Sequence, residues 1–410
     1  MIRRLQQSLR HRLVSLAGYA RLHRLAGALA YPGREFAGAG PDIRTARSIL
    51  VVKPDEIGDV VLATGFLRSL RRQCPQARIT LAVRPLCAEL VRDPVFGDEI
   101  VLWDDAWRGL RLEPRVMGRL VRTAWRRWHS APPDWAIVPR GGGDHVNAAF
   151  YAWWSGARQI CAHESFCTDW GLRRAALVNR IIPSPGVAHE IEFHRRMLTA
   201  LGLDSSAVQP ALSISAAART EAGIFWEGTG LTAGAVALGI GASGADKCWP
   251  LENFRALTAE LRSRWPKLGV VIVGGPEEQA VGEGLKIALG EGTCNAAGKL
   301  SVLGTAALLE RCNLYVGNDS GPAHLAAAMG CAVITITKHP LGGDPRSPYA
   351  PARFGPVARW SRILQPKPLE PACQNECARQ QAHCITGVRA EEAIRAIEAA
   401  AREGAFSPPA

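Results

Sequence analysis

Short apolar runs alternate with longer amphipathic segments along most of this chain, and this alternation constrains the fold more than any other feature. Four runs in the first half of the sequence are typical of buried strands, at 48–53, 78–84, 99–103 and 134–140. Two segments between them have a helical pattern, at 58–73 and 116–128. Alternating strands and helices form parallel sheets that helices cover on both faces. We therefore expect an α/β fold.

The alternation pauses in a Ser-, Ala- and Gly-rich stretch at 204–232 and then restarts with a strand pattern at 235–244. A chain of 410 residues is about long enough for two domains. The pause therefore predicts a domain boundary. We expect an N-terminal extension at 1–40, a first domain at 41–205, a linker at 206–232, a second domain at 233–388 and a terminal helix with a tail at 389–410.

Positive charge is concentrated at the N-terminus. The formal net charge is +12, and residues 1–40 hold seven Arg and one acidic residue. The rest of the chain is nearly balanced, so we do not expect a nucleic-acid partner. Apolar residues at helical spacing over 2–29 predict a basic amphipathic helix. Two interpretations stay open: residues 1–30 lie on an anionic membrane surface, or the helix packs on the protein itself.

No run of about 18 apolar residues predicts a membrane span, and no secretory signal is recognisable at the N-terminus. We expect a cytoplasmic protein, with peripheral binding to the inner face of the cytoplasmic membrane if the basic helix binds lipid. Three of the eleven Cys cluster with a His, as Cys373, Cys377, His383 and Cys384. Metal binding, a disulfide and plain packing all fit this cluster. Because its spacing is not a strong zinc pattern, we favour packing and expect no metal.

Loops that follow strands are the expected ligand sites in parallel sheets. In the second domain, the loop 241–250 contains small residues and Ser243, and then Lys247, whose ammonium group suits a phosphate. The loop 274–279 contains Glu277 and Glu278, either of which suits a ribose hydroxyl. An acidic residue there is also favoured simply by the helix dipole.

The stretch "GNDSGPAH" follows another predicted strand. Asp319 or Ser320 is a candidate helix cap, and Gly321 allows close backbone approach. The free N–H groups at a helix start also form a phosphate site, and His324 would lie in its first turn. Together with Ser243 and Lys247, this stretch predicts an anion-binding donor site.

The first domain has a different strand-end loop, in "KPDEIGD". This is not a phosphate-binding Walker loop, and its acidic residues would repel a phosphate. A carboxylate here suits a general base, and we favour Asp59, with a helix cap as the competing interpretation. Arg140, in the loop 139–145, is the candidate for binding an anionic acceptor.

Several of these motifs in combination resemble glycosyltransferase family 9, the bacterial ADP-heptose:lipopolysaccharide heptosyltransferases. The resemblance rests on "ILVVKPDEIGDVVLATGFLRSLRR", "GASGADKCWPLENFRALTAEL", "VGGPEE", "GNDSGPAHLAAAMG" and "HCITGV", and covers about 48–400. It implies a GT-B fold, in which two Rossmann-like domains face each other across a cleft. It further implies an acceptor site in the first domain and a nucleotide-sugar site in the second.

The resemblance also implies roles for individual residues. Asp59 matches the catalytic base, Lys247 matches a diphosphate ligand, and Glu277, or Glu278 if the match shifts by one, lies where the family contacts the nucleoside. The diphosphate and sugar loop corresponds to Asp319, Ser320, Gly321 and His324. The implied reaction is an inverting transfer of a heptose to a lipid-linked glycan such as the lipopolysaccharide core, without a cofactor or metal. The acidic "PDEI" before Gly58 departs from the family pattern and leaves the acceptor open.

Two other functions stay open at this point. One is a GT-B transferase that uses another sugar nucleotide or acts on a protein or capsule acceptor. The other is a nucleotide-sugar-binding protein without catalytic activity, which the joint presence of Asp59 and Lys247 disfavours.

Overall fold

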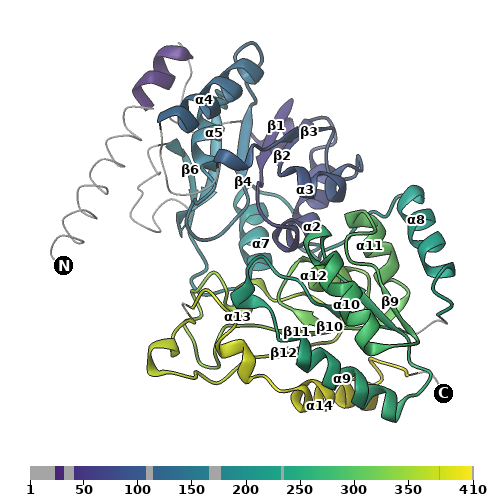
Figure 1. Cartoon of the computed structure of the whole chain (residues 1–410). Coiled ribbons are helices and arrows are strands. Elements are labelled where there is room, and N and C mark those ends of the chain that lie inside the picture. The colour runs from purple at the N-terminus through teal and green to yellow at the C-terminus, as the bar shows by residue number, and fades with distance from the viewer. Residues whose placement is uncertain are drawn as a thin grey trace. The chain divides into compact units, whose positions relative to one another are not determined.

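The computed structural model describes residues 24–31, 41–107, 114–165, 177–231, 235–377 and 379–408 (Figure 1). The chain divides into two compact units. Unit 1 comprises the described residues within Met1–Glu56 and Ala63–Gln209, and unit 2 comprises those within Ile57–Leu62 and Pro210–Ala410.

The described part of unit 1 contains one sheet of six strands in the order β3-β2-β1-β4-β5-β6, and every pair is parallel. The strands are β1 (Ser48–Val52), β2 (Arg78–Val83), β3 (Glu99–Leu102), β4 (Trp135–Val138), β5 (Gln159–His163) and β6 (Arg180–Ile182). The helices are α2 (Ile57–Gln73), α3 (Pro85–Ala88), α4 (Pro114–Trp128), α5 (Ala148–Trp154) and α7 (Glu190–Ala200).

The described residues of unit 2 form a second parallel sheet of six strands, in the order β12-β11-β10-β7-β8-β9. The strands are β7 (Ala235–Gly239), β8 (Val270–Val273), β9 (Thr293–Asn295), β10 (Cys312–Asn318), β11 (Ala332–Ile336) and β12 (Ser361–Leu364). The helices are α8 (Ala216–Glu227), α9 (Leu251–Arg264), α10 (Gln279–Leu289), α11 (Val302–Leu309), α12 (Gly321–Ala328), α13 (Pro351–Phe354) and α14 (Ala390–Arg402).

Both sheets have the same topology. When the strands of each unit are counted from its own first strand, both orders become 3-2-1-4-5-6, which is the Rossmann order. The expectation of two Rossmann-like domains is therefore confirmed. In this topology the strand order reverses between the first and fourth strands, and ligands bind beside the carboxyl ends of those strands. Ligand sites are consequently expected beside the ends of β1 and β4 in unit 1, and beside the ends of β7 and β10 in unit 2.

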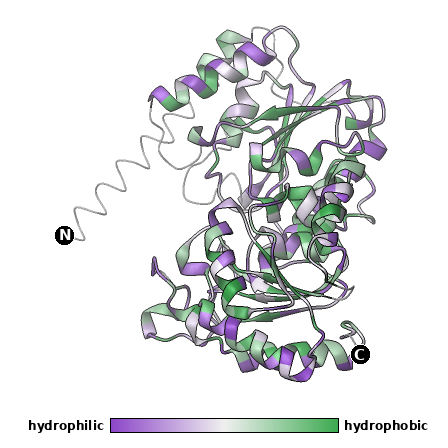
Figure 2. Ribbon diagram, turned by 45° about the vertical axis from the view of Figure 1, so that its right-hand side comes forward, coloured by the Kyte–Doolittle hydropathy of each residue, from purple (hydrophilic) through white to green (hydrophobic). Residues whose placement is uncertain are grey.

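The strands form the apolar centre of each unit, as Figure 2 shows by the hydrophobic colour along them. In unit 1 the rings of Trp103, Trp107 and Tyr151 pack together, with centroids 5.0–5.8 Å apart. In unit 2, α9 and α14 lie side by side over the sheet and share one hydrophobic core (Figure 1). The terminal helix predicted at 389–402 is thus an integral part of unit 2.

The predicted linker 206–232 needs a correction, because α8 occupies much of it. The Ser215 side chain caps α8, and Glu221 accepts hydrogen bonds from the amide (2.8 Å) and hydroxyl (2.7 Å) of Ser301 before α11. The small residues of this stretch, which suggested a flexible connection, instead allow α8 to pack on α11.

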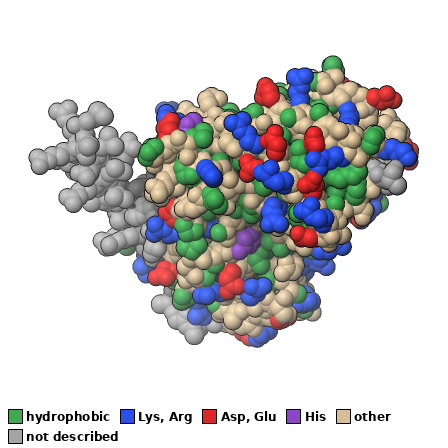
Figure 3. Space-filling view, turned by 90° about the horizontal axis from the view of Figure 1, so that it is seen from below, with side chains coloured by type: hydrophobic (Ala, Val, Ile, Leu, Met, Phe, Trp, Pro, Cys, Tyr) green, Lys and Arg blue, Asp and Glu red, His purple; other side chains and the backbone are tan. Residues whose placement is uncertain are grey.

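Of the basic N-terminal helix, only residues 24–30 lie within the described part of the chain, and they are helical. Tyr31 is also described, and residues 1–23 and 32–40 of the predicted extension lie outside the described residues. None of the helices in the described ranges combines the length and hydrophobicity that a membrane span requires. On the face drawn in Figure 3, the described Lys and Arg side chains are interspersed with Asp and Glu, which agrees with the near balance of charge beyond residue 40.

Candidate functional site

In unit 2, a buried amide joins the two loops at the point where the strand order reverses. The side chain of Asn318, at the end of β10, accepts a hydrogen bond from the Trp249 amide (2.8 Å) through Oδ1. Its Nδ2 donates to the Ile240 carbonyl (2.7 Å), which directly follows β7. Buried polar groups hold loops rigidly when fully hydrogen-bonded. Asn318 therefore fixes the loop 240–250 against the start of α12.

Two ammonium groups gather at this edge of the sheet. Lys247 Nζ donates to Ser243 Oγ (2.9 Å) and lies 4.5 Å from the centre of the Tyr349 ring. Lys338 Nζ lies 4.0 Å from the same ring and is paired with Asp246 at 2.5 Å. Because Asp246 neutralises Lys338, Lys247 is the more suitable cation for an anionic ligand.

The start of α12 differs from the expected helix cap. The Ser320 side chain makes no capping hydrogen bond, and its hydroxyl donates instead to the Asn318 carbonyl (3.3 Å). Because the Ser320 side chain does not cap α12, the Gly321 N–H at the helix start can serve an anionic ligand. Pro322 has no N–H, the Ala323 N–H donates to the Ser320 carbonyl (3.1 Å), and His324 is buried at the fourth position of the helix.

Asp319 lies beside this helix start. Burial raises the pKa of its carboxyl group to about 6, although the nearby Lys247 charge and a contact with Thr337 Oγ1 (3.5 Å) act in the opposite direction. The hydrogen bond from the Trp249 amide to Asn318 places the loop that contains Ser243 and Lys247 beside the helix start. The structure thus brings Ser243, Lys247 and Asp319 to the same edge of the sheet, and their role in binding a ligand stays a prediction.

The two glutamates after β8 have different surroundings. Glu278 Oε2 accepts a hydrogen bond from the Gly275 amide (2.7 Å), so its carboxylate caps the turn. A Cβ atom at Gly241 would lie 2.6 Å from the same oxygen, so glycine is needed for this close approach. Glu277 is exposed in the same turn. Glu277 therefore remains the candidate for a nucleoside contact, and Glu278 has a structural role.

Asp59 lies in the first turn of α2, within Ile57–Leu62, which belongs to unit 2. Its side chain is half-buried. Within unit 2, the neighbouring Gly58 approaches His324 so closely that a Cβ would lie 2.5 Å from the imidazole Cδ2. The role of Asp59 as a base stays a prediction.

In unit 1, the ends of β1 and β4 carry a buried ionic cluster. Asp55 pairs with Lys53 (3.1 Å) and with Arg140 (2.5 Å), and all three side chains are less than a tenth exposed. Burial alone would raise the pKa of Asp55, but Arg140 and Lys53 together hold this pKa well below its ordinary value. The structure therefore places Arg140 in an ion pair, and any acceptor contact would involve an already oriented guanidinium.

Other acidic groups in this region have structural partners. Glu190 Oε1 accepts a hydrogen bond from the Gly141 amide (2.9 Å), and the Asp144 carboxylate accepts from the first amides of α5. These contacts fix the loop between β4 and α5 around Arg140. A preformed loop of this kind is a suitable position for recognising a polar acceptor.

The sequence analysis did not single out Lys338, Tyr349 or the pairing of Lys53 with Asp55. Lys338 follows β11 by two residues, so extending the strand-end argument to that strand would have found it. Tyr349 lies thirteen residues beyond β11, and the contact of its ring with two ammonium groups depends on the fold of a long loop.

Comparison with known proteins agrees with this geometry. The sequence model described as "Glycosyltransferase family 9 (heptosyltransferase)" matches residues 153–339. Over these residues the chain is therefore similar to glycosyltransferase family 9. Lipopolysaccharide heptosyltransferase 3 of Escherichia coli is 29% identical over 186 residues, which are 44% of this chain and 54% of that protein. The chain thus matches about half the length of this curated relative.

Solved family 9 structures share the fold. A family 9 glycosyltransferase from Veillonella parvula has a TM-score of 0.71 at 21% identity, covering 90% of this chain and all of that one. E. coli ADP-heptose lps heptosyltransferase II has a TM-score of 0.61 at 18% identity, covering 87% of this chain and 99% of that one. The expected GT-B class is therefore confirmed at the level of fold.

The residues matched by the family 9 model include the candidate region in unit 2 but not the one in unit 1. The match includes the unit 2 loops with Ser243, Lys247 and Asp319, but it begins after Asp59 and Arg140. The candidate region in unit 2 is thus supported by both geometry and sequence similarity. The candidate region in unit 1 is supported by geometry and by the motif resemblance.

Proposed function

We propose that this chain is an inverting glycosyltransferase that moves a heptose, or a related sugar, from a nucleotide diphosphate donor to a glycan acceptor. The observation that carries the proposal is the arrangement in unit 2, where Lys247 lies beside the uncapped start of α12. A cation and a backbone N–H group at a helix start form a suitable site for a diphosphate. The names of the relatives favour ADP-heptose as the donor and the lipopolysaccharide core as the acceptor.

In the proposed reaction, Asp59 accepts the proton of an acceptor hydroxyl as that oxygen attacks the anomeric carbon. The bond from this carbon to the diphosphate breaks, and the nucleoside diphosphate leaves with the bonding electron pair. Lys247 and the Gly321 amide stabilise the negative charge that develops on the leaving group. Ser243, Ser320 and His324 complete the phosphate and sugar surroundings, and Glu277 contacts the nucleoside. No cofactor takes part in these steps.

On the acceptor side, the proposal assigns Arg140 to an anionic group of a lipid-linked glycan. Asp55, which is itself paired with Lys53, would hold the guanidinium in place for this contact. The basic segment 1–30 would keep the enzyme at the anionic inner face of the cytoplasmic membrane, where a lipid-linked acceptor is available. The protein would then be cytoplasmic and peripheral.

Thermal unfolding with and without ligands tests the proposal. A donor that binds only the folded protein should raise the midpoint, by an amount that grows with ligand concentration. We expect ADP-heptose to raise it, UDP-sugars to raise it less, and Lys247→Ala to reduce the shift. The exposed Lys267→Ala is a matched control that should behave as wild type. Stabilisation by UDP-sugars but not by ADP-heptose would favour the alternative donor class, and no stabilisation by any nucleotide sugar would refute the proposal.

Turnover separates an enzyme from a binding protein of the same specificity. Incubation with ADP-heptose and a heptose-deficient lipopolysaccharide acceptor should release ADP and add one sugar to the acceptor. Donor binding without ADP release for any glycan, capsule or protein acceptor would instead support the non-catalytic alternative.

A further inference from the structure

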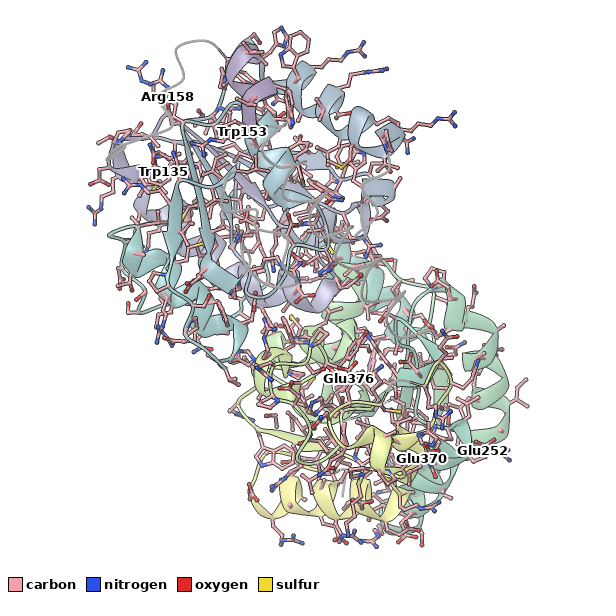
Figure 4. The ribbon with its side chains drawn as sticks, turned by 90° about the vertical axis from the view of Figure 1, so that its left-hand side faces the viewer. Trp135, Trp153, Arg158, Glu252, Glu370 and Glu376 are labelled. Atoms are coloured by element: carbon pink, nitrogen blue, oxygen red, sulfur yellow. The ribbon has the colours of Figure 1, made fainter. Side chains whose placement is uncertain are left out.

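The connection between β12 and α14 is held by an unusual group of side chains. The described residues of this connection, 365–377 and 379–389, contain only short 3₁₀ turns, among them η8 (Pro371–Cys373) and η9 (Cys384–Gly387). Cys373, Cys377 and Cys384 are buried and form a separate small cluster between these turns. Glu370 and Glu376 of the same connection are labelled in Figure 4. Such a segment has little regular hydrogen bonding of its own to fix its conformation.

One ring nitrogen lies close to all three thiols. His383 Nδ1 lies 3.8 Å from Cys373 Sγ, 3.6 Å from Cys377 Sγ and 3.4 Å from Cys384 Sγ. A neutral ring nitrogen has either one N–H or one lone pair, so it can form a normal hydrogen bond with only one of these sulfurs. Hydrogen bonding therefore does not explain why three thiols converge on this atom.

Tetrahedral coordination does explain the convergence. Zinc–sulfur bonds of about 2.3 Å and zinc–nitrogen bonds of about 2.0–2.1 Å, at tetrahedral angles, place each sulfur about 3.6 Å from the nitrogen. The three measured distances bracket this value. The four candidate ligand atoms also all lie within 4.8 Å of one another. Packing of three cysteines alone would not require the imidazole nitrogen to lie at this distance from each sulfur.

The other side of the imidazole has the partner that a metal ligand needs. His383 Nε2 lies 3.3 Å from Glu370 Oε1, and Arg379 in turn donates to both oxygens of Glu370 (3.0 and 2.7 Å). A carboxylate that accepts the Nε2 proton leaves the Nδ1 lone pair directed at the thiols. Metal-ligating histidines are commonly oriented by a carboxylate in this manner.

We propose that Cys373, Cys377, Cys384 and Nδ1 of His383 bind one thiophilic divalent metal ion, with Glu370 orienting the histidine. Three thiolates and one imidazole match the donor set of structural zinc sites, and Fe²⁺ is the other ion that this set accommodates. Since four protein ligands complete a tetrahedron, the ion has no open position for a substrate. Its role is to fix the connection between β12 and α14.

The position of the metal site gives it a consequence for the rest of unit 2. Lys338 Nζ donates to the Cys377 carbonyl (3.4 Å) as well as pairing with Asp246, next to Lys247. Ser347 Oγ donates to Glu376 (2.9 Å), which ties the loop before Tyr349 to the same connection. The bound ion would therefore help to hold Lys338 and the loop before Tyr349 in place near Lys247. The metal proposal itself does not depend on the proposed function.

The decisive experiment measures metal in the full-length protein, purified without chelators and, in parallel, without oxygen. Elemental analysis by mass spectrometry should find about one zinc or iron per wild-type chain. Cys377→Ala should lose it, whereas Cys294→Ala, at another buried cysteine in β9, should retain it. Replacement by Co²⁺ should give thiolate-to-cobalt charge-transfer absorption in wild type and in the control.

A second variant guards against simple misfolding of Cys377→Ala. Glu370→Gln keeps all four ligands and should weaken metal affinity by about 10- to 100-fold, as measured by competition with a chromophoric chelator. Chelation should also lower the thermal midpoint of wild type but not that of Cys377→Ala. Wild-type protein that contains no stoichiometric metal and shows no thiolate–cobalt absorption would overturn the proposal, as would a disulfide between two of the three cysteines.

Discussion

Replacing Asp55 by Asn removes the negative charge that pairs with both Lys53 and Arg140 in the buried ion cluster. Both cations would stay buried, at 2% and 9% side-chain exposure, without the carboxylate that compensates them. Removing one partner of a buried ion pair typically destabilises a protein by about 3–5 kcal/mol, because an uncompensated charge remains. An amide can still accept a hydrogen bond, so we expect about 3 kcal/mol for Asp55→Asn.

The same ion cluster predicts how stability depends on pH. The pKa of Asp55 is below its unfolded value of about 3.9, so the folded state binds its proton less readily than the unfolded state. The stabilisation is therefore complete above about pH 5 and is lost as the pH falls from about 4 toward the lowered folded pKa. Asp55→Asn should lack this contribution, and the stability difference from wild type should shrink in acid.

Urea denaturation followed by tryptophan fluorescence measures both effects. The transition that reports unit 1 should shift to lower urea with an unchanged slope, which indicates a change of stability and not of compactness. Glu310→Gln, in an exposed ion pair with Arg219, is the control and should give no resolvable shift. A loss for Asp55→Asn below about 1 kcal/mol at pH 7, or a difference that does not shrink in acid, would refute the assigned electrostatics.

Three further predictions concern the donor and acceptor sides. Lys247→Ala should weaken donor binding by about 10- to 100-fold, the effect of losing a charge-assisted hydrogen bond, and calorimetry against Lys267→Ala would detect it. Asp59→Asn should keep donor affinity by calorimetry and lose sugar transfer, and retained turnover would remove Asp59 from the role of base. Asp319→Asn should stabilise unit 2 relative to wild type more at pH 8 than at pH 4 in denaturant titrations. The reason is that burial raises the pKa of Asp319 to about 6, so the destabilisation of the wild type by this carboxyl group grows as the pH rises from about 4 to about 6 and is constant above.

Most elements were predictable because each depends on a local pattern. The apolar run at 48–53 became β1 at Ser48–Val52, and the helix predicted at 58–73 is α2 at Ile57–Gln73. The stretch 204–232 was misleading because small residues allow either a flexible chain or close helix packing. Nothing local distinguishes the two, and α8 forms because Ser215 caps it and α11 covers it.

The site was predictable where it lies at strand ends and was missed where it depends on distant pairing. Ser243, Lys247 and Asp319 follow β7 and β10, and the strand-end rule brings them together. The ion pair of Asp55 with Arg140 joins positions 85 residues apart, so only the order of the strands decides it. The spacing of Cys373, Cys377, His383 and Cys384 likewise fits no strong pattern, although the folded chain gathers their ligand atoms within 4.8 Å.

The two units show how one topology can provide two kinds of site. In unit 1 the first and fourth strands end in Lys53, Asp55 and Arg140, which satisfy one another's charges and hold a preformed polar surface. In unit 2 the equivalent strands end in small residues, backbone amides and Lys247, which suit an anionic ligand. A nucleotide diphosphate needs a compensating cation, whereas a hydroxyl acceptor needs orientation more than charge. The chemistry at the strand ends therefore supports our proposal that the donor binds in unit 2, which Lys247→Ala and Asp319→Asn test most directly.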